Sequence, residues 1–142
     1  MTNTSDIRNV ILLGHGSSGK TSLAEAALHS TGVQNRLGSV DEKTSICDYL
    51  DEEKAHQHSV HSSVVHVEHG GKSINIIDSP GYPDFVGPSI KALAAAETGI
   101  VVVSAAAGIE ISTRKMFQRL EKSGKPRIIV INKIDAENID LA

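Results

Sequence analysis

The chain has 142 residues, of which 39% are hydrophobic and 22% charged, as in one ordinary globular domain. Its formal net charge of -3 excludes a strongly basic surface, so we expect no nucleic-acid phosphate contacts from this segment. The single cysteine, Cys47, excludes an internal disulfide, and the most apolar stretch, Gly99–Ile109, is too short to span a membrane, so we expect a cytoplasmic protein.

The first predicted elements are a strand, a glycine-rich loop and a helix, in that order. Asn9–Leu13 (NVILL) is a short β-branched apolar run, typical of a strand buried on both faces of a parallel sheet. Gly14–Thr21 (GHGSSGKT) follows it directly, and from Lys20 onward apolar residues recur at helical spacing. These apolar residues are Leu23, Ala24, Ala27 and Leu28.

The glycine-rich loop satisfies two phosphate-binding patterns at once. As GxGxxG it would open a dinucleotide-binding Rossmann unit, which needs an acidic residue about 20 positions later at the end of a second strand. Asp41 lies near that distance, but the sequence around it is polar and turn-like. As GxxxxGK[ST] it is a Walker A loop, and the order of strand, loop and helix favours this interpretation over Rossmann binding or a chance turn.

The Walker A interpretation gives each loop residue a role. Backbone N–H groups turn inward on the phosphates, and the helix N-terminus adds the positive end of its dipole. Lys20 would bridge the β- and γ-phosphates, and Thr21 would offer its hydroxyl to Mg²⁺. The other loop residues expected to bind nucleotide are Gly14, His15, Gly16, Ser17, Ser18 and Gly19.

A long polar excursion, Gly32–Ser59, separates this helix from the next strands, and such loops are usually functional or disordered. Within it we expect Asp51–Lys54 (DEEK) to be a solvated face, with an ordering of the switch by its acidic residues as the alternative. We expect Cys47 to be a small loop residue rather than a nucleophile. Histidines follow at short intervals, and alternation could place some of them on one strand face as metal ligands. We expect a solvated edge strand and a mobile switch instead. These histidines are His56, His58, His61, His66 and His69.

The second half of the chain predicts a hairpin and then two helix–strand units. Ser63–His69 and Lys72–Asp78 are strand-like and are joined by two glycines, which predicts a tight antiparallel hairpin. An antiparallel pair in an otherwise parallel sheet resembles Ras-like and translational GTPases more than kinases. The remaining predicted elements are a helix over Pro88–Glu97, a strand over Ile100–Ser104, a helix over Ser112–Lys122 and a strand over Arg127–Ile131.

Two short motifs follow predicted strands. In DSPG (Asp78–Gly81) a carboxylate can reach Mg²⁺ through water, and the Gly81 N–H can approach the γ-phosphate. In NKID (Asn132–Asp135) the Asp135 carboxylate can accept hydrogen bonds from the N1–H and the amine of guanine. Adenine would leave it unpaired at a cost of about 1–3 kcal/mol, so GTP is favoured over ATP. We expect Asn132, Lys133 and Asp135 to bind the nucleotide.

The chain resembles the translational GTPases, and within them the N-terminal part of elongation factor G and its paralogues. The resemblance rests on IRNVILLGHGSSGKTSLAEAAL, INIIDSPGYPDFVGPSIKAL, VVVSAAAGIE and KPRIIVINKID, and it covers nearly the whole chain. It implies an α/β P-loop domain over residues 1–142, with a mostly parallel sheet and one antiparallel hairpin. It also implies binding of GTP, GDP and Mg²⁺, GTP hydrolysis, and a ribosome as partner of the full-length protein.

This sequence departs from the family pattern at four positions. Ser79 replaces a threonine, and Tyr82 replaces the histidine that positions the attacking water. A phenol can donate or accept a hydrogen bond but lacks the charged form that an imidazole offers near neutral pH, so we expect nucleotide binding to persist and hydrolysis to depend on whether Tyr82 orients water. Ser59 stands where a threonine would contact Mg²⁺, and Ser17 where an aspartate is frequent. The expected catalytic residues are Lys20, Gly81 and Tyr82, and the expected metal ligands are Thr21, Ser59 and Asp78.

The resemblance leaves several functions open. An elongation factor G-like translation GTPase is the main expectation, since some elongation factor G-like paralogues share a tyrosine at the Tyr82 position. A ribosomal protection GTPase of the tetracycline-resistance kind and a GTP-dependent binding module with negligible hydrolysis are the alternatives. The family's last guanine loop, strand and helix would follow Ala142, so we expect a C-terminally truncated domain with weak GTP affinity. Its exposed sheet edge would favour self-association.

Overall fold

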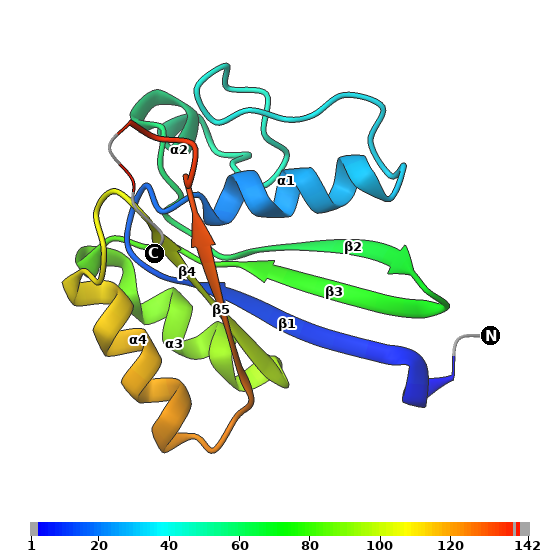
Figure 1. Ribbon diagram of the computed structural model, residues 1–142. Helices are drawn as coiled ribbons and strands as arrows, with labels where there is room; N and C mark the ends of the chain where they lie inside the picture. Colours follow the sequence, from blue (N-terminus) through cyan, green and yellow to red (C-terminus); the bar gives the residue numbers. More distant parts are fainter. Residues whose placement is uncertain (1–2, 138, 140–142) are drawn as a thin grey trace.

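The computed structural model describes residues 3–137 and 139, and it forms one α/β unit (Figure 1). Among these residues, no helix combines the length and the hydrophobicity needed to span a membrane. The elements in chain order are a 3-10 turn η1 (Thr4–Asp6), β1 (Ile7–Leu13), α1 (Lys20–Ser30), α2 (Asp51–His56), β2 (Ser63–His69), β3 (Lys72–Asp78), a 3-10 turn η2 (Pro83–Phe85), α3 (Val86–Ala95), β4 (Thr98–Ser104), α4 (Ile111–Lys122) and β5 (Arg127–Asn132).

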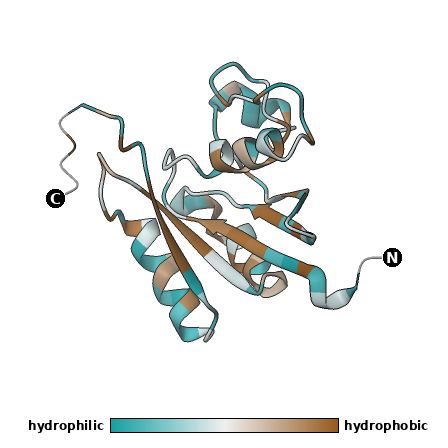
Figure 2. Ribbon diagram, turned by 45° about the vertical axis from the view of Figure 1, so that its right-hand side comes forward, coloured by the Kyte–Doolittle hydropathy of each residue, from teal (hydrophilic) through white to brown (hydrophobic). Residues whose placement is uncertain are grey.

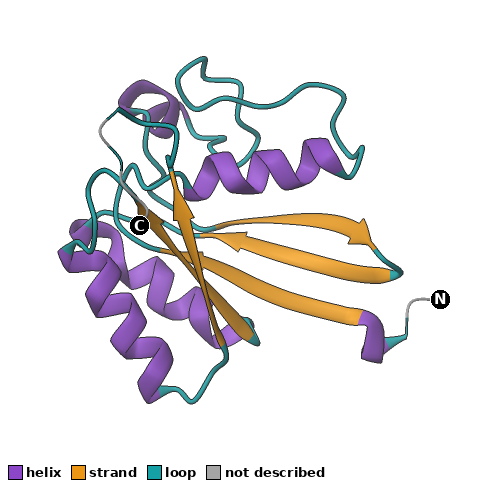
Figure 3. Ribbon diagram, viewed as in Figure 1, coloured by secondary structure: helices purple, strands orange, loops and turns teal. Residues whose placement is uncertain are grey.

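The five strands form one sheet in the order β2-β3-β1-β4-β5 (Figure 3). β1 pairs in parallel with β3 and β4, and β4 pairs in parallel with β5. β2 pairs antiparallel with β3 from Ser63↔Asp78 to His69↔Lys72, so the predicted hairpin is confirmed with its Gly70–Gly71 turn. The fold class expected from the sequence is therefore correct.

Helices cover both faces of the sheet: α1 lies on one face, and α3 and α4 lie on the other (Figure 1). Successive side chains of β1 point to opposite faces of the sheet and so enter two core layers. Leu12 packs towards α1, while Ile11 and Leu13 pack towards α3 and α4. Figure 2 shows hydrophobic residues concentrated along the central strands. Besides β1, the α1 layer contains Ala24, Leu28, Cys47, Val65, Val67 and Ile76, and the other layer contains Ile77, Leu93, Ala96, Val101, Met116 and Leu120.

The long polar excursion, Gly32–Ser59, is more ordered than its composition suggests, because it contains α2 and buried residues, among them Glu53 and Cys47. The expectation of a solvated DEEK face is wrong for Glu53, whose side chain has no exposed surface. Its carboxylate accepts hydrogen bonds from the backbone N–H groups of Leu50, Val60 and His61, at 2.9–3.2 Å. Cys47 lies in the α1 layer of the core, where burial raises the pKa of its thiol, as suits a packing residue.

Candidate functional site

The polar motifs of the sequence meet at the edge of the sheet where the parallel strands end. The loop after β1, the loop after β3 and the loop after β5 all open there, as expected for the carboxyl ends of parallel strands. A cavity of about 250 Å³ lies between them. Its lining includes Gly16, Ser17, Gly19, Lys20, Thr21, Asp48, Ser59, Gly81, Tyr82 and Lys133.

The glycine-rich loop runs from the end of β1 at Gly14 to the start of α1 at Lys20. Gly19 has a left-handed φ of +95°, and a side chain there would collide with the Asn132 amide. That amide donates to the Ser18 carbonyl oxygen at 3.0 Å, which ties the loop to the end of β5. His15, within the same loop, has its Nε2 3.3 Å from a Glu110 carboxylate oxygen.

Lys20 points back into the loop. Its side chain is only 6% exposed, and its Nζ donates to the His15 carbonyl oxygen at 2.7 Å. Burial lowers the pKa of Lys20, while the charges of Asp78 and Asp48 act in the opposite direction. Gly81 lies directly against Lys20 Nζ and the backbone nitrogen of Gly16. The residues expected to contact a γ-phosphate are therefore neighbours.

A cluster of hydroxyls and carboxylates lies beside Lys20. The Thr21 hydroxyl donates to Asp78 Oδ2 at 2.7 Å and lies 3.4 Å from the Ser59 hydroxyl. The Ser59 hydroxyl in turn donates to Asp48 Oδ1 at 2.7 Å. The structure thus brings together the three residues expected to bind metal and adds Asp48. Sequence analysis missed Asp48 because it lies in the aperiodic excursion, where no motif marks it.

The electrostatics of this cluster favour a bound cation. Burial raises the pKa of Asp78 to about 6, although the hydrogen bond from Thr21 and the charge of Lys20 act to lower it. Burial also raises the pKa of Asp48. Asp78 Oδ1 and Asp48 Oδ2 are buried and accept no hydrogen bond from the described residues. Carboxylate and hydroxyl oxygens are ligands that suit Mg²⁺, so the donor set fits that ion.

The side chains expected to recognise guanine lie at the end of β5. Asn132 is held through Ser18, as described above, and Lys133 has a left-handed φ of 58° and an exposed side chain. Asp135 is also exposed. Asn132 ends β5 and contacts the glycine-rich loop, and Lys133 lines the same cavity as that loop. Asp135 lies two residues further along the chain, and no contact fixes its carboxylate among the described residues.

Tyr82 and Ser79 belong to the loop after β3. Tyr82 is 36% exposed, and its hydroxyl lies 3.4 Å from that of Ser17. Ser79 is buried, and its hydroxyl donates to the Leu12 carbonyl oxygen at 2.6 Å. The serine hydroxyl therefore secures this loop to β1 and leaves Tyr82 facing the phosphate loop.

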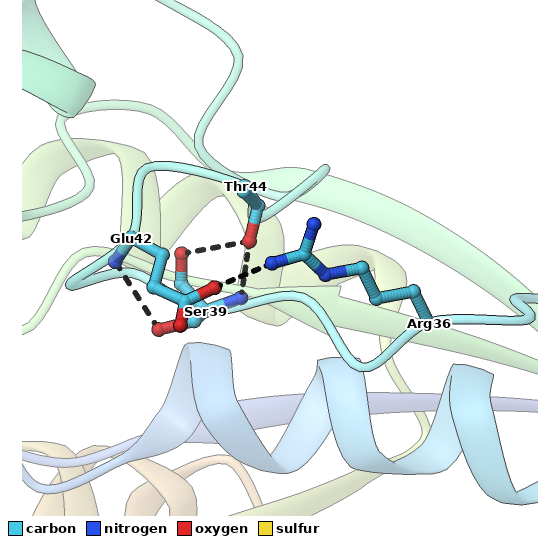
Figure 4. Close-up of polar contacts among 4 residues, drawn as sticks. All are labelled: Arg36, Ser39, Glu42 and Thr44. Atoms are coloured by element: carbon cyan, nitrogen blue, oxygen red, sulfur yellow. Dashed lines mark hydrogen bonds and ion pairs between the residues drawn. The ribbon is translucent and has the colours of Figure 1, made fainter.

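The segment that covers the site is fixed to α1 by Glu25, which has no exposed surface. Its carboxylate accepts from the Ser45 hydroxyl at 2.7 Å, the Ile46 N–H at 2.8 Å and the Gln34 amide at 3.0 Å. The turn between these contacts is closed by polar side chains, including an Arg36–Glu42 ion pair at 2.7 Å (Figure 4). Sequence analysis did not identify Glu25, since one glutamate on a helix gives no signal of burial.

Comparison with known proteins finds a match to the family model described as the elongation factor Tu GTP binding domain, over residues 5–141. An elongation factor G-like protein of Mycobacterium tuberculosis is 40% identical over 129 residues, covering 91% of this chain and 18% of that protein. The tetracycline resistance protein TetO of Campylobacter jejuni is 37% identical over 135 residues, covering 95% and 21%.

A solved structure is also similar to this chain. The crystal structure of a Thermus thermophilus protein matches with a TM-score of 0.89 and 42% identity, covering 92% of this chain and 20% of that one. The chain therefore spans about a fifth of the length of the relatives that it matches.

Proposed function

This chain belongs to the elongation factor Tu GTP-binding domain family, and from that premise we propose that it is a Mg²⁺-dependent GTPase of the elongation factor G-like type. It binds GTP and GDP, and the full-length protein acts in translation in the cytoplasm, with the ribosome as its partner. The observation that carries the proposal is the cluster of Thr21, Asp78, Ser59 and Asp48 beside the buried Lys20.

The phosphate end of the nucleotide would lie over the glycine-rich loop. The loop N–H groups and the N-terminus of α1 stabilise phosphate charge, and the Lys20 ammonium bridges the outer two phosphates. Thr21, Ser59 and Asp78 would hold Mg²⁺, with Asp48 as a further oxygen donor. When bound, Mg²⁺ supplies positive charge against the developing charge on the transferred phosphoryl group.

Hydrolysis would be mainly electrostatic. Lys20 neutralises charge on the leaving phosphate, and the Gly81 N–H donates to the γ-phosphate. Tyr82 has a hydroxyl that can both donate and accept, so it can orient the attacking water. Loss of the γ-phosphate would remove the contacts that it adds to the Ser59 and Gly81 segments, and switching would follow from that loss.

Two observations support the alternatives. The identity to TetO supports a ribosomal protection GTPase as second candidate. Tyr82, which lacks an imidazole, supports a GTP-dependent binding module with negligible hydrolysis. Single-turnover hydrolysis of GTP by the full-length protein, with and without ribosomes, separates an enzyme from such a module, because only the enzyme releases phosphate faster when ribosomes are present.

Self-association through the sheet edge is also proposed. β5 lies at the end of the strand order, and Ile128, Ile129 and Ile131 are each at least half exposed on it. An edge strand with exposed apolar side chains can pair with the same strand of a second copy. Sedimentation measurements over a range of concentrations test this, and a monomer at every concentration would exclude it.

The first experiment is a calorimetric titration of the chain with GTP, GDP and ATP in Mg²⁺. Guanine selectivity requires the Asp135 carboxylate, so Asp135→Ala should reduce the preference for GTP over ATP by about tenfold. Glu68→Ala is the matched control, because it deletes an exposed carboxylate that lies on β2. It should leave the preference for GTP over ATP unchanged. Equal affinity of the unsubstituted chain for GTP and ATP would refute the proposed guanine site.

A further inference from the structure

The ring of Tyr82 packs on the bare backbone of the phosphate loop. A methyl group added at Gly16 would lie 2.6 Å from Cζ, 2.7 Å from Cε2 and 2.9 Å from Cε1 of that ring. A Cβ atom essentially never lies so close to another heavy atom, so a side chain at residue 16 would displace the Tyr82 ring from this position. The His15 ring flanks Tyr82 with its centroid 6.1 Å away. One face of the phenol is thus in contact with the loop that we propose to bind phosphate.

His58 makes the closest aromatic contact with Tyr82. The two ring centroids lie 4.9 Å apart at an interplanar angle of 60°, which is within the range of favourable tilted aromatic pairs. The Phe85 ring lies 5.9 Å from His58 and extends this aromatic group. His58 itself is half-buried and lines the same cavity as Lys20 and Ser59.

The position of His58 is fixed by its own backbone. Its N–H donates to the Glu53 carbonyl oxygen at 3.3 Å, and its Nδ1 lies 3.0 Å from the His56 carbonyl oxygen. A carbonyl only accepts, so Nδ1 carries the proton in this contact. The buried Glu53 carboxylate also binds the N–H groups of Val60 and His61. The imidazole is therefore held by a well-anchored segment.

We propose that His58 is a positioning residue for Tyr82: together with Gly16 it holds the phenol over the phosphate loop, so that the three residues act as one unit. The consequence for hydrolysis rests on the proposed function, in which the Tyr82 hydroxyl orients water. The proposal also predicts what a substitution of Tyr82 would do. Tyr82→His alone leaves a smaller ring between Gly16 and His58, so it does not simply exchange one water-orienting group for another.

Tyrosine fluorescence gives a direct test in the nucleotide-free chain. The chain has two tyrosines and no tryptophan, so in a Tyr49→Phe background Tyr82 is the single fluorophore. Acrylamide quenching then measures how far its ring is covered. Removing the stacked ring with His58→Ala should raise the quenching constant by about twofold or more. His58→Phe keeps a ring at this position and should restore the background value.

Two further variants and a melting curve complete the test. Gly16→Ala should raise quenching as His58→Ala does, and His69→Ala, an exposed histidine at the end of β2, should leave it unchanged. Thermal unfolding followed by circular dichroism identifies any variant that has lost its fold. An unchanged quenching constant in folded His58→Ala, or a His58→Phe variant that behaves like His58→Ala, would overturn the proposal.

Guanine-nucleotide affinity of the same proteins separates this proposal from the proposed function. The expected quenching pattern without nucleotide binding would contradict the GTP site and support the role of His58. If the chain binds nucleotide but the quenching constant does not change in the His58 and Gly16 variants, the role of His58 is contradicted and the GTP site is not.

Discussion

The phosphate side and the base side of the site are built in opposite ways. On the phosphate side Lys20 and Asp78 are buried, and the hydroxyls of Thr21 and Ser59 already have partners. On the base side Lys133 and Asp135 are exposed. A group that is already ordered loses little conformational entropy when a ligand binds, whereas an exposed side chain must be ordered at that moment. The residues that we propose to bind phosphate are therefore preorganised in this chain, and those that we propose to select the base are not.

Removing the central charge of the phosphate side should have the largest effect. Lys20→Met keeps the length of the side chain but removes the ammonium, so affinity for GTP, GDP and ATP should each fall by about 100-fold. The ratio of GTP to ATP affinity should stay the same, because this side does not contact the base. Calorimetry measures both quantities, with the exposed Lys115→Met on α4 as control. A loss of affinity for only one of the three nucleotides would contradict the separation of phosphate binding from base selectivity.

The order of the phosphate side should also depend on its anchor in α2. Glu53→Ala leaves three backbone N–H groups without their acceptor, so the free energy of unfolding should fall by about 1–3 kcal/mol. Urea denaturation measures this change. The neighbouring Glu52→Ala removes an exposed carboxylate from the same helix and should cost far less. Similar losses in both variants would mean that burial of Glu53 contributes nothing.

A smaller effect should appear in the pH dependence of stability without nucleotide and Mg²⁺. Burial raises the pKa of Asp78 from 3.8 to about 6, so between these values the folded chain binds more protons than the unfolded chain. The contribution of Asp78 to stability should therefore fall as pH rises through this window. Asp78→Asn removes the titration, and the difference in melting temperature between the two proteins measures it. A difference that does not change with pH would exclude the raised pKa.

Local patterns predicted the elements around the site because each pattern carries its own signal. The Gly-Gly dipeptide specified the hairpin, and Gly14–Thr21 specified strand, loop and helix together. Asp48 and Glu53 carry no such signal, since an acidic residue in a polar stretch has the same local sequence whether it is solvated or buried. Their burial depends on partners far along the chain, such as Ser59 for Asp48. Sequence alone therefore located the motifs but missed what orders the segment between them.

The two buried glutamates hold the covering segment at two separate places. Amide protons of Ile46 and Cys47 donate to Glu25 on α1, whereas those of Val60 and His61 donate to Glu53 on α2. Hydrogen exchange at the first pair reports release from the helix that starts at the phosphate loop, and exchange at the second pair reports release of the Ser59 region. One stretch of chain can thus open in two steps, and each step has its own pair of backbone reporters.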